Sequence, residues 1–117
     1  MNDAPFNVAW NVVSRMSAAD PAELFRKLAS HAAKLEPLRK LDLTSSAILD
    51  MIWERENQSP TTLGCGLILP HARVGKLESL CAVCTTLEHP LDCETPDDVP
   101  VVFGCMLLIP EERPVEG

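Results

Sequence analysis

The chain has 117 residues, with 23% charged and 46% hydrophobic side chains, which is typical of one globular domain and excludes wholesale disorder. Seventeen Asp plus Glu against ten Lys plus Arg give a net charge of −7. That balance disfavours nucleic-acid binding, which needs cations to neutralise phosphates, and suits solubility or a basic protein partner.

The N-terminal residues MNDAPFNVAW lack the basic and apolar regions of a signal peptide, and no apolar run approaches the ~20 residues of a membrane span. We therefore expect a cytoplasmic protein with no direct membrane insertion. Phe6, Val8, Trp10 and Val12 alternate with other residues, and this period of two predicts a strand over residues 6–13 with one buried face.

Two helices are predicted next. Asp20 is suited to cap the first, Pro21 fits its first turn, and apolar residues recur at helical spacing as far as Leu35, before Pro37. The second is predicted to begin within residues 42–45 and to end near residue 56.

Residues 57–62 (NQSPTT) then predict a turn, and residues 63–66 a glycine-containing corner. The run from Leu67 to Leu69 is too short for a helix and predicts a buried strand that stops at Pro70-His71.

Two further strands are predicted over residues 78–87 and 101–109, separated by an acidic, proline-rich loop. Both are apolar on both of their faces, as expected of strands covered on both sides. The element order predicts an α/β fold with a mixed central sheet flanked by helices. Only two helices are available to cover that sheet. We therefore expect residues 1–117 to form a single domain that is incomplete at its C-terminus, or one whose sheet a partner covers.

The candidate functional residue is His71, at the end of a predicted strand. Pro70 precedes it, Arg73 follows two residues later, and Arg55 closes the second helix sixteen residues upstream. A neutral imidazole is a competent nucleophile, and guanidinium groups fit phosphoryl oxygens. The pattern therefore indicates phosphoryl acceptance on His71, although a single histidine at a strand end is more often structural.

This stretch resembles the IIA component of the fructose, mannitol and nitrogen-regulatory branch of the bacterial phosphoenolpyruvate-dependent phosphotransferase system. In that family a helix ending in Arg-Glu is followed by a Ser/Pro-Thr turn, a glycine corner, a short apolar strand and Pro-His. The corresponding residues here are Arg55-Glu56, Pro60-Thr61, Gly64 with Gly66, Leu67 to Leu69, and Pro70-His71. Pro90-Leu91-Asp92 and the strand ending in Pro110-Glu111 agree with the family as well, so the resemblance covers roughly residues 10 to 112.

The resemblance implies a phosphotransferase-system component with roles for four residues. His71 would be the phosphoacceptor, which receives its group from HPr or from the nitrogen-branch analogue. Arg55 would neutralise the phosphoryl charge. Thr61 would donate its hydroxyl to the site or to its loop backbone. Arg73 would contact the phosphate or the partner, and a solvated charge is an equally open interpretation. No cofactor and no metal is implied.

Two outputs follow from the resemblance. The phosphoryl group passes to a IIB domain during sugar uptake, or the phosphorylation state regulates a target protein. An alternative from another class is a regulatory protein-interaction domain that keeps the fold without phosphoryl exchange. The family continues into two C-terminal helices that cover one sheet face. Their absence from this sequence predicts a homo-oligomer or a domain swap.

The five cysteines are an odd number and mostly lie in apolar runs, which indicates buried thiols rather than a disulfide framework. Cys81 and Cys84 have CxxC spacing but fall mid-strand, where they face opposite sides, so packing is favoured over a metal or redox site. A Cys65–His71 nucleophilic pair stays open as a weaker alternative. Trp53 is expected to pack, and Asp97-Asp98 to form a solvated turn.

Overall fold

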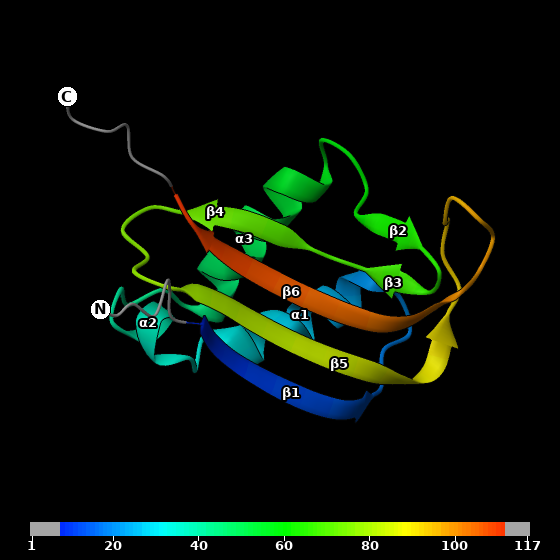
Figure 1. Cartoon of the computed structure of the whole chain (residues 1–117), viewed down its shortest axis with the longest axis horizontal. Helices are drawn as coiled ribbons and strands as arrows, with labels where there is room; N and C mark the ends of the chain where they lie inside the picture. The colour runs from blue at the N-terminus through cyan, green and yellow to red at the C-terminus, as the bar shows by residue number, and fades with distance from the viewer. Residues whose placement is uncertain (1–7, 112–117) are drawn as a thin grey trace, which may run out of the picture.

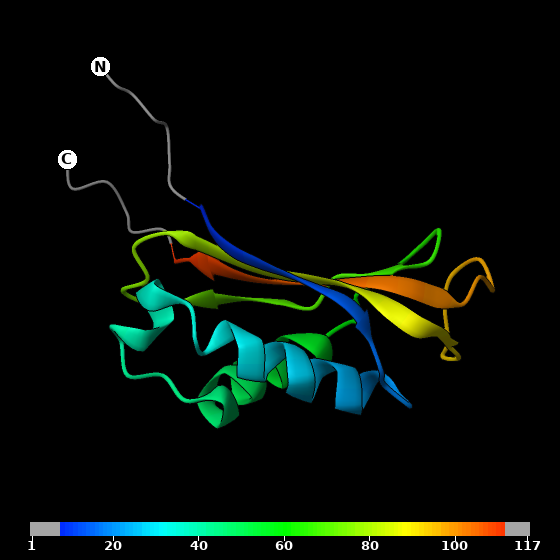
Figure 2. The same ribbon diagram turned by 90° about the horizontal axis from the view of Figure 1, so that it is seen from below.

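A mixed six-stranded sheet carries the helices on one of its faces (Figures 1 and 2) in the computed structural model, which describes residues 8–111. The strands lie in the order β1-β5-β6-β3-β2, and β4 also pairs with β6. The pairs β1–β5, β3–β6 and β4–β6 are parallel, whereas β5–β6 and β2–β3 are antiparallel. The predicted α/β class with a mixed central sheet is therefore confirmed. The bounds of the strands are β1 (Val8–Met16), β2 (Thr62–Gly64), β3 (Leu67–Ile68), β4 (His71–Val74), β5 (Leu80–Leu91) and β6 (Val101–Pro110).

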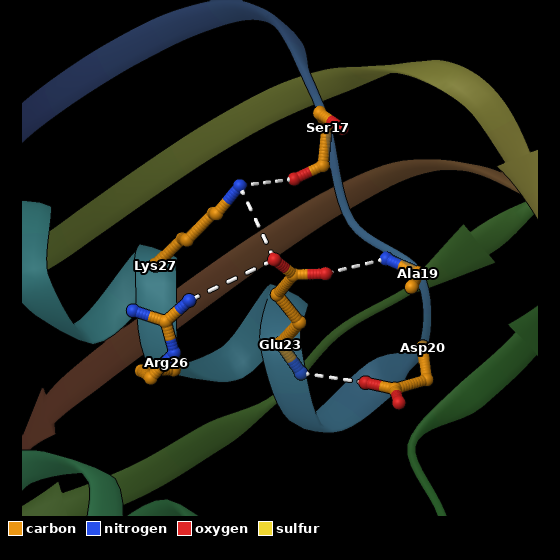
Figure 3. A network of polar contacts seen from close by, with 6 residues as sticks. All are labelled: Ser17, Ala19, Asp20, Glu23, Arg26 and Lys27. Carbon is orange, nitrogen blue, oxygen red and sulfur yellow. Dashed lines mark hydrogen bonds and ion pairs between the residues drawn. The ribbon is translucent and has the colours of Figure 1, made fainter.

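The helices of the described chain are α1 (Pro21–Ala32), α2 (Glu36–Arg39) and α3 (Ser45–Glu56). As predicted, Asp20 caps α1: its Oδ1 accepts the backbone N–H of Glu23 at 2.8 Å (Figure 3). Glu23 Oε1 accepts the N–H of Ala19 at 2.7 Å. This bond, together with the nearby Lys27 ammonium, lowers the pKa of Glu23 below its ordinary value.

The hydrophobic core fills the space between one sheet face and the pair α1 and α3. Phe25 and Ile52 from the helices are fully buried against Val83 and Leu108 from the sheet. Trp53 packs on Phe25 with ring centroids 5.0 Å apart, so the predicted packing role of Trp53 is confirmed.

The opposite face of the sheet is uncovered within residues 8–111 (Figure 2). Trp10 on this face is 66% exposed. In the strand register Trp10 pairs with Ala82, Ala82 also pairs with Leu107, and Leu107 also pairs with His71. These paired positions form one row across four strands and share a face. The prediction that the strands of residues 78–87 and 101–109 are covered on both sides therefore does not hold in the described chain.

Several predicted boundaries differ from the structure. The first strand runs over Val8–Met16, and the predicted positions Phe6 and Asn7 lie outside the described residues. The first helix ends at Ala32, because Leu35 adopts an extended backbone and precedes the short helix α2, with a proline in its first turn. Strand β5 continues to Leu91, into the segment predicted as loop.

No helix within residues 8–111 is long and apolar enough to cross a membrane. The cysteines are less uniformly buried than the sequence predicts. Cys81 is buried, Cys65 is exposed, and Cys84, Cys93 and Cys105 are half-buried.

Candidate functional site

His71 begins strand β4 and does not end the preceding strand, which corrects the prediction from sequence. Proline has no N–H to donate to a strand ladder, and here Pro70 separates β3 from β4. Both short strands nevertheless pair with β6, and Leu107 donates its N–H to the Pro70 carbonyl oxygen at 2.9 Å. Strand β6 therefore fixes the backbone on both sides of the histidine.

The imidazole of His71 is held by a local hydrogen bond. Its Nδ1 lies 2.9 Å from the carbonyl oxygen of Leu69. A carbonyl oxygen only accepts, so Nδ1 carries the proton. In the neutral imidazole the lone pair then lies on Nε2, so this nitrogen is the one that could act as a nucleophile.

The loop between α3 and β2 is hydrogen-bonded to the end of α3. Glu56 accepts two hydrogen bonds from Thr61, from its N–H at 3.0 Å and from its hydroxyl at 2.7 Å. The carbonyl oxygen of Thr61 in turn accepts the N–H of Leu69 at 2.9 Å. A continuous chain of hydrogen bonds thus links Glu56 through Thr61 and Leu69 to the His71 ring. The Thr61 hydroxyl is used within this chain and bonds neither the loop backbone nor a group in the pocket.

A pocket of about 450 Å³ lies beside His71. It brings together three of the predicted site residues, His71, Arg55 and Arg73. Thr61 is buried and does not line the pocket. The Arg55 Nη1 donates to the carbonyl oxygen of Ser59 at 2.9 Å, which orients the guanidinium fork and leaves further N–H donors on it. Two arginines against one acidic side chain, Glu54, favour an anionic ligand in this pocket.

The remaining lining residues were missed by sequence reasoning. They are Met51 and Glu54 from α3, Gln58 from the turn after it, and Ala72 and Ile109 from the sheet. A signal for one of them exists, because Met51 lies four residues before Arg55 and therefore shares its face of α3.

Neither the Cys65–His71 nucleophilic pair nor a metal site gains support from the geometry. Cys65 does not line this pocket; its N–H donates to Asp97 Oδ2 at 2.7 Å, at the corner between β2 and β3. Asp97 also accepts the N–H of Val99 at 3.1 Å. In the turn that was expected to be solvated, the Asp97 carboxylate is therefore hydrogen-bonded to two backbone N–H groups. Within residues 8–111, no group of three or more His, Cys, Asp or Glu side chains is placed to hold a metal ion.

The sequence profile of one protein family matches residues 9–114, nearly the whole chain: phosphoenolpyruvate-dependent sugar phosphotransferase system, EIIA 2. The chain belongs to this family. The resemblance inferred from the Arg-Glu to Pro-His stretch is thereby confirmed.

Two relatives of this chain carry names of regulators. The chain is 30% identical over 89 residues to a nitrogen regulatory protein of Bradyrhizobium diazoefficiens, an alignment that covers 76% of this chain and 55% of that protein. It is 35% identical over 66 residues to a probable licABCH operon regulator of Bacillus subtilis, covering 56% of this chain and 10% of that protein. The chain thus spans about half of the first relative and a small part of the second.

The fold has a counterpart among solved structures. The nitrogen regulatory protein IIA-Ntr of Neisseria meningitidis superposes with a TM-score of 0.73 at 24% sequence identity, over 86% of this chain and 65% of that chain. This likeness supports the arrangement of sheet and helices described above.

Proposed function

We propose that this chain accepts a phosphoryl group on Nε2 of His71 from phosphorylated HPr or its nitrogen-branch analogue. The observation that carries the proposal is the 2.9 Å contact from His71 Nδ1 to the Leu69 carbonyl oxygen, which leaves Nε2 as the nucleophile. The pocket with Arg55 and Arg73 beside it offers positive charge for the transferred group.

The chemistry follows from these positions. The Nε2 lone pair attacks phosphorus, a nitrogen–phosphorus bond forms, and the corresponding bond to the donor histidine breaks. Such transfers pass through a loose transition state with charge spread over three equatorial oxygens, so alignment and charge stabilisation dominate catalysis. The Arg55 fork is the group suited to bind those oxygens. The Leu69 carbonyl stabilises the positive charge that the imidazole gains as phosphorus binds.

The output that we favour is regulatory. Both curated relatives carry names of regulators. Accordingly, this chain would bind a target protein and regulate it through its phosphorylation state. Onward transfer to a IIB domain remains the second output, and the two are separated by which protein receives or senses the phosphoryl group.

The experiment is phosphoryl transfer from labelled phosphoenolpyruvate through enzyme I and HPr, and separately through their nitrogen-branch counterparts. Label is expected on the wild-type chain and on His89→Ala, a control at an exposed histidine, but not on His71→Ala. Arg55→Ala is expected to slow transfer roughly 100-fold, the scale for removal of one transition-state donor. An unlabelled, folded wild-type chain with both donor sets would instead favour the domain without phosphoryl exchange.

A further inference from the structure

Two cysteines face each other on neighbouring strands of the sheet, and neither of them lines the His71 pocket. Cys84 on β5 and Cys105 on β6 are directly opposite in the antiparallel register. Their Sγ atoms are 2.9 Å apart, and both residues are half-buried with free thiols. Opposed positions in antiparallel strands have Cα atoms about 4.5–5.5 Å apart, which lies within the range that a disulfide spans.

Both sulfurs lie on the uncovered face of the sheet. Cys81 and Val83 of β5 belong to the core under the helices, and so do Met106 and Leu108 of β6. Because successive side chains of a strand alternate in direction, Cys84 and Cys105 point to the other side. A small oxidant that approaches this face therefore reaches the pair without displacing α1 or α3.

The other cysteines are placed away from this pair. Cys81 is fully buried in the core on the opposite face, which confirms that the CxxC cysteines point apart. Cys93 packs against the same core, and Cys65 is exposed at the corner between β2 and β3. The geometry therefore favours a bond between Cys84 and Cys105 over any other pair of cysteines.

We propose that Cys84 and Cys105 form a reversible disulfide across β5 and β6 when the protein meets a low-molecular-weight disulfide such as oxidised glutathione. This redox site is distinct from the proposed phosphoryl site and does not depend on it.

The reaction has two exchange steps. The Cys84 thiolate attacks one sulfur of glutathione disulfide; a mixed disulfide forms and one glutathione thiolate leaves. The Cys105 thiolate then attacks Sγ of Cys84, the Cys84–Cys105 bond forms, and the second glutathione leaves as thiolate. The two protein thiols lose two electrons to glutathione disulfide, and their two protons end on the two glutathione thiols.

The environment of Cys105 lowers its reactivity as a thiol. Burial and the neighbouring Cys84 thiol raise the pKa of Cys105 to about 12. Little of the Cys105 thiol is therefore ionised at neutral pH, and this low thiolate fraction slows the second exchange step. The contact between the two sulfurs offsets this, since an attacking group held beside its target acts at a high effective concentration.

The test is peptide mapping of the reduced protein after incubation with oxidised glutathione. Trypsin cannot separate the relevant cysteines, because residues 77–112 contain no Lys or Arg. A protease that cleaves after glutamate yields peptides 79–88 and 95–111, which carry Cys84 and Cys105 respectively. We expect these two peptides to be joined, the intact mass to fall by about 2 Da, and added dithiol to restore five free thiols.

Variants assign the bond. Cys84→Ala and Cys105→Ala should each abolish the joined peptides, while Cys81→Ala, which removes the other cysteine of peptide 79–88, should retain them. Cys65→Ala serves as a control at an exposed thiol, and circular dichroism verifies that each variant is folded. Joined peptides through Cys81 or Cys93, or glutathione that stays on Cys84 of the folded protein without closure, would overturn the proposal.

Discussion

The Nδ1 atom of His71 is 2.9 Å from the carbonyl oxygen of Leu69, its neighbour but one in the chain. Pro70 lies between them and restricts the backbone of this short segment. The ring is therefore oriented by the backbone just before its own strand, and the nitrogen that stays free of this bond is Nε2.

The first prediction concerns the site of phosphorylation on the ring. Nitrogen-15 spectra of the phosphorylated chain should show phosphorus coupled to Nε2 of His71, with the proton retained on Nδ1, because the Leu69 carbonyl occupies the other nitrogen. Phosphorus on Nδ1 would contradict the hydrogen bond as the feature that selects the nucleophile.

The second prediction concerns the bonds between Glu56 and Thr61. Glu56→Gln removes one of two acceptors, and the N–H or hydroxyl of buried Thr61 then loses its partner. A loss of about 1–3 kcal/mol in the free energy of unfolding is expected, measured by urea denaturation. We also expect slower labelling of His71, because the loop that positions Leu69 loosens.

Asp50→Asn is the matched control for this variant, since it makes the same type of change at an exposed position of the same helix. It should leave both stability and labelling near wild type. Equal effects of the two variants would indicate that helix charge is responsible, not the bonds to Thr61.

The third prediction concerns the start of α1. Asp20→Ala removes the acceptor of the Glu23 N–H and should lower the free energy of unfolding by about 1 kcal/mol. Asp20→Asn keeps an acceptor oxygen at the cap and should recover most of that loss. Identical unfolding curves for Asp20→Ala and wild type would show that the cap contributes nothing measurable.

The fourth prediction concerns acid. Hydrogen bonds from the Cys65 and Val99 N–H groups lower the pKa of Asp97 below its ordinary value of 3.8. A carboxyl whose pKa is lower in the folded state stabilises the fold above its unfolded pKa, and this contribution is lost as pH falls through the folded pKa. The measurement is the thermal unfolding temperature as pH falls from 5 to below the ordinary pKa of Asp97. This temperature should fall less for Asp97→Asn than for wild type.

The fifth prediction concerns the uncovered sheet face. Trp10 is 66% exposed in a row with Ala82 and Leu107, and apolar surface of this kind favours association. We expect concentration-dependent self-association in light scattering, reduced by Trp10→Ser. Leu63→Ser, at an exposed apolar residue of strand β2, is the control and should not reduce it. A monomer at high concentration would contradict the homo-oligomer inferred from sequence.

Much of the fold was accessible from local patterns. The cap at Asp20, the helical period that buries Phe25 and the apolar run over residues 101–109 are determined by nearby residues, so they could be predicted. Strand β4 could not, because four residues after a proline form a strand only where β6 offers its edge. The extension of β5 to Leu91 likewise depends on its pairing with Val101.

The sequence by itself determined the family and the identity of His71, Arg55 and Arg73 as candidate residues, since these depend on residue types at fixed spacing. Only the tertiary structure decided which imidazole nitrogen is free, and it directed the Thr61 hydroxyl to Glu56. It also placed Cys84 against Cys105 rather than with Cys81, because strand alternation separates the near neighbours and β-register joins the distant ones.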